Sequence, residues 1–253
     1  NVMVIMTEQA NLSAAYGIED RDARAWYVYD TLTAVSEPTQ APLLEYLDGR
    51  GLAYFSFFGQ NAVGVVAADA DAVQALAAMP GVSLIRLEKV MEIPPEPGAP
   101  PVGIQAFGQS AGEPDTVEWN ILDVHADQVW ALGYRGEGLV VANMDTGVHY
   151  THEALYWRYR GWDGMSYDHN HNWWDPSEIC GPHGSPPCDN DGHGTETMGV
   201  ITGKDEAGVH EIGMAPAATW IACKGCEYNS CSEFALTSCG DFFVAPWDEY
   251  GEN

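Results

Sequence analysis

A histidine flanked by glycines constrains this chain more than any other stretch. Residues 189–203 read DNDGHGTETMGVITG, with His193 between Gly192 and Gly194. Met198 and Ile201 have the spacing of one helix face, so we expect His193 in the first turn of a helix that ends near Gly203. The glycines would let other backbone approach the imidazole. The positive end of the helix dipole disfavours a charged imidazolium, so the sequence predicts a neutral imidazole that can act as a base.

A base of this kind needs a carboxylate to orient it, and the chain offers one upstream. Residues 138–148 read GLVVANMDTGV, which predicts a buried strand with Asp145 at its C-terminal end. Sites in open α/β sheets form at the carboxyl ends of strands. A strand-end Asp and a helix-start His make two thirds of an acyl-transfer triad. We therefore expect Asp145 and His193 to be catalytic and to lie side by side.

Three motifs resemble the subtilisin-like serine proteases, or subtilases, in the order of that family. They are Asp145-Thr146-Gly147, the glycine-flanked histidine and residues 213–218, which read GMAPAA. Residues 130–134 and the Tyr150-Thr151-His152 stretch are similar to the bacillopeptidase F-like branch. His149 departs from the pattern, since an acidic residue is expected there. The resemblance implies a secreted endopeptidase that cuts protein or peptide substrates with an Asp-His-Ser triad.

The first 93 residues predict a small α+β domain. Their apolar runs follow the order β-α-β-β-α-β, a split βαβ or ferredoxin-like unit. Pro38 and Pro42 are expected to interrupt the first helix, and Asp69 or Asp71 to cap the second. Beside a subtilase segment, this domain resembles the family's inhibitory propeptide, with residues 88–100 as the tail that enters the substrate cleft. The predicted strands are 2–6, 52–58, 62–67 and 82–87, and the helices 21–47 and 73–79.

The proline-rich run 94–101 opens a linker that we place at 94–117. Residues 118–253 would then be a subtilisin-like peptidase domain. The resemblance implies a partial three-layer α/β fold with a mostly parallel sheet, truncated before the serine motif. Residues 220–223 predict its next strand and residues 234–244 its next helix.

The family resemblance also implies one wall of a substrate cleft over residues 225–232, with Gly225, Cys226 and Ser232 as substrate-binding candidates.

The six cysteines all lie after residue 179, which fits local disulfides in an exported protein. A Cys180–Cys188 bond would close a turn-rich loop before His193. Pairing among the remaining four stays open, and a redox or zinc role for the C-x-x-C at 223–226 is the alternative. The disulfide candidates are Cys180, Cys188, Cys223, Cys226, Cys231 and Cys239.

No Gly-Thr-Ser-Met-Ala-like motif, which would carry the nucleophile, occurs in the 253 residues. We therefore predict that this chain hydrolyses no peptide and is the first part of a longer precursor. The alternative is a non-catalytic protease inhibitor or binding protein on a pseudo-enzyme scaffold. An aspartic protease would need a second Asp-Thr/Ser-Gly, which the sequence lacks.

Charge and hydropathy exclude some classes of binding partner. The net charge of −27, with ten Lys plus Arg, disfavours nucleic acid and anionic membranes. No apolar stretch approaches the ~18 residues needed to span a bilayer. We expect a monomer that needs no cofactor and is inhibited by its own propeptide.

The segment 149–183 is rich in histidine, but its spacings match no zinc motif. Calcium is a candidate structural ion, with Asp189, Asp191, Asp205 and Glu206 as oxygen donors.

Overall fold

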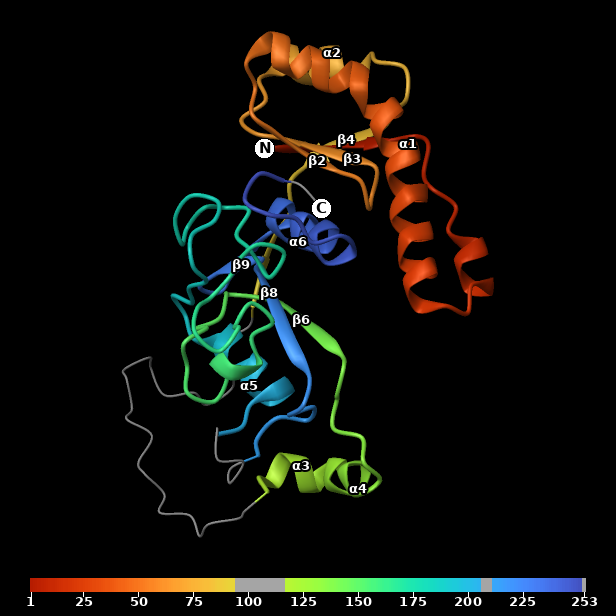
Figure 1. Ribbon diagram of the computed structural model, residues 1–253. Coiled ribbons are helices and arrows are strands. Elements are labelled where there is room, and N and C mark those ends of the chain that lie inside the picture. The colour runs from red at the N-terminus through yellow and green to blue at the C-terminus, as the bar shows by residue number, and fades with distance from the viewer. Residues whose placement is uncertain (94–116, 206–210, 252–253) are drawn as a thin grey trace. The chain divides into compact units, whose positions relative to one another are not determined.

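The structure is a computed structural model and describes residues 1–93, 117–205 and 211–251. It divides into two compact units (Figure 1). The first unit holds Asn1–Met91 and Ser232–Pro246, and the second holds Glu92–Cys231 and the residues from Trp247. Most of the linker placed at 94–117, and Glu206 of the calcium candidates, lie outside the described residues. In the part of the chain that the structure describes, every helix is too short or too polar to cross a membrane.

The first unit is built on an antiparallel sheet with the strand order β2-β3-β1-β4. Apart from the short 3-10 helix η1, the element order in residues 1–87 is strand, helix, strand, strand, helix, strand. The strands are β1 (Val2–Met6), β2 (Tyr54–Phe57), β3 (Ala62–Val65) and β4 (Val82–Leu87); the helices are η1 (Ser13–Gly17), α1 (Arg21–Arg50), α2 (Ala70–Ala77) and, from the far end of the chain, α6 (Glu233–Val244).

Both faces of this sheet are apolar because side chains alternate along each strand. One face, with Val2 and Val4 of β1, packs against Leu43 and Leu47 of α1 and Leu76 of α2. On the other face, Met3, Phe57 and Ala62 pack with Phe234 of α6. Figure 1 shows α6 on the side of the sheet opposite to α2. The sheet is therefore covered by helices on both faces.

The interruption of the first helix expected at Pro38 and Pro42 is wrong, because α1 runs unbroken from Arg21 to Arg50. Asp20 caps its start by accepting a hydrogen bond from the Ala23 N–H, and Gly51, in the left-handed conformation, ends it. Both prolines lie on the exposed side. The buried positions Leu32, Ser36, Gln40, Leu43 and Leu47 form a continuous stripe, whose packing outweighs the lost backbone bonds. Asp69 caps α2.

The second unit contains a parallel sheet with the strand order β6-β8-β7. Its core includes Val148, Leu155, Tyr159, Met198 and Trp220, all at most 1 % exposed. Two short helices, Trp119–Asp123 and Ala126–Ala131, are separated at His125, whose φ of 61° is left-handed. The elements are α3 (Trp119–Asp123), α4 (Ala126–Ala131), β6 (Val140–Asp145), η2 (Tyr156–Arg158), β7 (Trp173–Trp174), α5 (His193–Thr202), β8 (Thr219–Lys224) and β9 (Cys226–Glu227).

Two further short strands, β5 (Val90–Glu92) and β10 (Ser230–Ser232), contain the positions at which the chain passes from one unit to the other. Within the second unit, β9 and β10 form an antiparallel hairpin in which Glu227 pairs with Ser230. The N–H of Ile93 donates to the carbonyl of Asn229 at 2.8 Å. The tip of the hairpin thus binds the backbone of the segment that follows β5.

Candidate active site

The structure brings Asp145 and His193 together although 48 positions separate them. Asp145 is the last residue of β6, and His193 is the first residue of α5, as the sequence predicted. The His193 Nδ1 atom lies 2.7 Å from Asp145 Oδ1. The Asp145 side chain is 11 % exposed, whereas that of His193 is 36 % exposed. The carboxylate is therefore held inside, and the imidazole reaches solvent.

The protonation of His193 differs from the sequence-based expectation. The helix dipole alone predicts a lowered imidazole pKa, but the pKa of His193 is raised. The main cause is the hydrogen bond to Asp145; burial opposes it, and the charges of Asp145, Asp191 and Glu196 add to it. The dipole argument failed because a carboxylate in direct contact acts more strongly on the ring than helix partial charges do.

Two glycines make the approach of β6 and α5 geometrically feasible. A Cβ on Gly194 would lie 2.0 Å from the Gly147 carbonyl oxygen, and a Cβ on Gly147 would lie 1.9 Å from the Cys188 oxygen. Gly147 also has φ near +107°, which only glycine adopts readily. The expectation that glycine lets backbone come close to the histidine is thus confirmed at Gly194. Gly192 instead supplies a left-handed turn, since a Cβ there would meet no atom within 4 Å.

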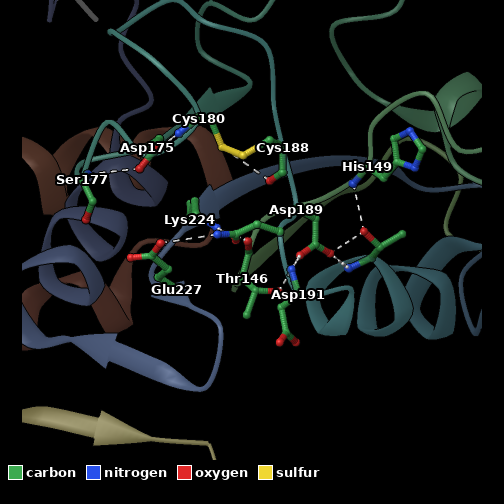
Figure 2. The surroundings of a disulfide bond; sticks show 12 residues. Thr146, His149, Asp175, Ser177, Cys180, Cys188, Asp189, Asp191, Lys224 and Glu227 are labelled. Atoms are coloured by element: carbon green, nitrogen blue, oxygen red, sulfur yellow. Dashed lines mark hydrogen bonds between the residues drawn. A yellow bond between two sulfur atoms is a disulfide. The ribbon is translucent and has the colours of Figure 1, made fainter. Parts of the chain in front are cut away.

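Asp189 organises the turn before α5, a role that the sequence did not reveal. Its carboxylate accepts hydrogen bonds from the N–H groups of Gly192 and Thr195, each at 2.9 Å, and from the hydroxyl of Thr146 at 2.9 Å. Burial raises the pKa of Asp189, but the hydrogen bonds from Thr195, Gly192 and Asp191 outweigh it and hold the pKa below its ordinary value. Asp189 therefore joins the Thr146 turn to the start of the histidine helix (Figure 2).

Lys224 is a second residue that sequence reasoning missed. It ends β8 and is paired in register with Asp145 on the neighbouring strand. Its ammonium donates to the carbonyl oxygen of Thr146 and, at 2.7 Å, to Oδ1 of Asn190. The signal in the sequence is a lysine at the end of a buried strand, in a chain with few cations.

The three substrate-binding candidates occupy different positions. The Gly225 N–H donates to the carbonyl oxygen of Asp145 at 2.9 Å, and Cys226 begins β9. Ser232 is the N-cap of α6, where its hydroxyl accepts from the Ala235 N–H and donates to Glu88. No substrate contact tests these assignments, so they stay predictions.

All six cysteines are in disulfides. Cys180 pairs with Cys188, as expected, and Cys226 pairs with Cys231. The Cys180–Cys188 bond closes the loop just before Asp189 (Figure 2). Because Cys226 is bonded to Cys231, the redox and zinc alternatives for the C-x-x-C stretch are not supported.

The histidine-rich segment packs against aromatic rings. His183 stacks on Trp174 with ring centroids 4.3 Å apart, and His169 Nδ1 lies 3.1 Å from the Tyr159 hydroxyl. Across the described ranges, no three His, Cys, Asp or Glu side chains gather in a way that could hold a metal ion.

Comparison with known proteins gives a family match over part of the chain. The sequence model of the subtilase family matches residues 136–238, which include Asp145 and His193. Bacillopeptidase F of Bacillus subtilis (strain 168) is 28% identical over 232 residues, which are 88% of this chain and 16% of the relative. Minor extracellular protease Vpr of the same organism is 36% identical over 102 residues, 39% of this chain and 11% of the relative. Neuroendocrine convertase 2 of Mus musculus is 29% identical over 111 residues, 43% of this chain and 15% of the relative. The chain thus spans less than a fifth of the length of each of these proteins.

Proposed function

We propose that this chain, whose residues 136–238 match the subtilase family, is part of the precursor of a secreted serine endopeptidase. The observation that carries the proposal is the 2.7 Å contact between His193 Nδ1 and Asp145 Oδ1. A buried carboxylate on one ring nitrogen holds the tautomer in which the other nitrogen can accept a proton. The raised pKa of His193, caused first by Asp145, fits a base whose charged form is stabilised after proton transfer.

In this mechanism His193 removes the proton of a serine hydroxyl as that oxygen attacks the peptide carbonyl carbon. The imidazolium then gives the proton to the leaving amine nitrogen as the C–N bond breaks. Asp145 stays ionised throughout and stabilises the imidazolium. The 253 residues hold no Gly-Thr-Ser-Met-Ala-like motif, so the serine would come from polypeptide outside them. The chain alone is expected to hydrolyse no peptide.

The N-terminal α+β domain would act as an intramolecular inhibitor. The contact between the Ile93 N–H and the carbonyl oxygen of Asn229 supports this, because it binds the segment after β5 to the turn of the β9–β10 hairpin. In the same interpretation Gly225, Cys226 and Ser232 belong to the substrate-binding region.

Secretion is supported by the disulfides and by the similarity to a protease described as extracellular. A monomeric state completes the proposal, whereas the described ranges hold no cluster of acidic side chains that supports the structural calcium ion.

The decisive experiment compares casein hydrolysis by this chain with that by a gene product extended through a Gly-Thr-Ser motif. We expect hydrolysis only by the extended product. Asp145→Asn should lower its kcat by about 10⁴-fold, because the imidazole loses its orienting anion. His125→Asn is the matched control: His125 is an exposed, left-handed residue, asparagine tolerates that conformation, and kcat should not change. Full activity of the Asp145→Asn enzyme would refute the assignment.

The alternative, a non-catalytic inhibitor or binding protein, makes a different prediction. A gene product without a downstream serine motif would hydrolyse nothing, yet it would bind and inhibit a mature protease. Measuring inhibition of an added subtilase by this chain separates the two functions.

A further inference from the structure

The two oxygens of the Asp145 carboxylate have different partners. Oδ1 accepts from His193 Nδ1 and from the Thr146 N–H, each at 2.7 Å. Oδ2 lies 3.2 Å from the hydroxyl of Thr197. Thr197 follows His193 by four positions in α5, so one turn of helix presents both side chains to the same carboxylate.

Asn143 determines what the Thr197 hydroxyl can do. It lies on β6 two residues before Asp145, and its side chain therefore points to the same face of the sheet. Its amide Nδ2 donates to Thr197 Oγ1 at 3.0 Å and to the Gly194 carbonyl oxygen at 3.1 Å. Asn143 is 9 % exposed, so this arrangement is shielded from water.

A hydroxyl has one proton, and Thr197 Oγ1 has two acceptors within reach: Asp145 Oδ2, and the Gly194 carbonyl oxygen at 3.1 Å. The carbonyl already accepts from Asn143, whereas the carboxylate is charged and makes the stronger hydrogen bond. The proton of Thr197 therefore points to Asp145. The direction of donation runs from Asn143 through Thr197 to the carboxylate.

We propose that Thr197, held by Asn143, is a positioning residue that fixes the rotation of the Asp145 carboxylate against His193. The inference rests on the proposed function, since it gives the Asp145–His193 pair a third member. The terminal torsion of an aspartate is broad, and partners on one oxygen alone leave the other free to swing. A donor on Oδ2 removes that freedom. It also draws negative charge from the carboxylate and so lowers the basicity of Oδ1 towards the imidazole.

The consequence can be measured without a nucleophilic serine. When Thr197→Val removes the donor and keeps the shape, the carboxylate should attract the imidazolium more strongly. The pKa of His193 should therefore rise, by less than the roughly 1–2 that the whole hydrogen bond represents, because the ring senses its loss only through the carboxylate. The other groups whose charges act on the ring, Asp191 and Glu196, are unchanged by this substitution.

The experiment is an NMR titration of the histidine side chains in the full 253-residue chain, with the His193 signal assigned by its loss in His193→Gln. Thr197→Ser keeps the hydroxyl and should leave the pKa of His193 at its wild-type value. Thr202→Val is the matched control, because Thr202 is a buried threonine of the same helix whose hydroxyl contacts the Met198 carbonyl oxygen. It should leave the titration unchanged.

The inference is overturned if Thr197→Val leaves the His193 titration as it is in the wild type, or if Thr202→Val shifts it equally. If Thr197→Val does not fold, the wild-type Thr197 hydroxyl proton gives the answer. Its resonance must follow the titration of His193, and a resonance independent of pH refutes the contact. Asp145→Asn separates this inference from the proposed function. If Asp145→Asn fails to lower the pKa of His193, the catalytic pair itself is wrong. If Asp145→Asn lowers that pKa and Thr197→Val leaves it unchanged, only the role of Thr197 is wrong.

Discussion

Lys224 holds an ammonium group in a place that water hardly reaches, since the residue is 1 % exposed. Burial lowers its pKa, and the negative charges of Asp175, Asp189, Glu227 and Asp191 oppose that change. Its two acceptors, the Thr146 carbonyl and Asn190, belong to the turn after Asp145 and the turn before His193. One buried cation therefore joins the two loops that carry the candidate catalytic groups.

Replacing this cation should weaken the fold more than removing a surface charge does. Lys224→Met leaves buried acceptors and nearby carboxylates without their partner, so we expect the free energy of unfolding to fall by about 3 kcal/mol. Urea unfolding under oxidising conditions measures the change. Lys89→Met, at an exposed position, should change the free energy by less than about 0.5 kcal/mol. Equal effects of the two substitutions would contradict the role given to Lys224.

At the scale of elements, α6 is attached to the β1–β4 sheet by charged groups as well as by Phe234. Arg86 of β4 makes two hydrogen bonds of 2.6 Å to Glu233. Asp241 is 4 % exposed and accepts hydrogen bonds from the N–H groups of Phe58 and Gly59, both at 2.9 Å. Burial nevertheless raises the pKa of Asp241 to about 6, because the two hydrogen bonds only partly offset the loss of water.

The Asp241 carboxyl predicts a pH dependence for the first unit. Its pKa in the folded state lies above its ordinary value, so folding favours the protonated form, and the stability that this gives is lost as the pH rises through about 6. Between pH 5 and pH 7 the contribution of Asp241 should fall by about 1 kcal/mol. Urea unfolding at the two pH values, compared with Asp241→Asn, measures it: the variant should lack this part of the slope. Asp71→Asn, which changes an exposed carboxylate of α2, should keep it.

At the scale of the whole molecule, charge is the dominant property. The net charge of −27 is carried by 253 residues with ten Lys plus Arg. Like charges at this density repel one another and oppose the folded state, and dissolved ions screen that repulsion over about 10 Å at 0.1 M salt.

Raising NaCl from 0.02 to 0.3 M should therefore stabilise the protein. We expect each thermal transition near pH 7.5 to rise by about 2–4 °C, which corresponds to roughly 1 kcal/mol for a chain of this size. Calorimetry measures the transitions, and an equal ionic strength of KCl is the control for a specific sodium effect. A midpoint that stays constant or falls with salt would show that repulsion is not the main electrostatic term.

Much of the local structure could be predicted because it depends on neighbouring residues. The start of α5 at His193, the end of β6 at Asp145, the Asp69 cap and the Cys180–Cys188 loop all follow from short-range patterns. The prediction failed for the prolines of α1, where burial of a long stripe of leucines with Ser36 and Gln40 outweighs local propensity. It also failed for the direction of the His193 pKa, because contact with Asp145 outweighs the helix dipole.

The sequence by itself determined which groups can do chemistry here: a histidine at a helix start and an aspartate at a strand end, with glycines where backbones must meet. Only the tertiary structure decided how those groups are supported. Thr197 and Asn143 contact the aspartate or its neighbours, and Lys224 and Asp189 join its loop to the histidine helix. These are contacts between segments far apart in the chain, made by common residue types without a local pattern. Their energy comes from charged and polar groups buried together, and burial is known only when the chain has folded.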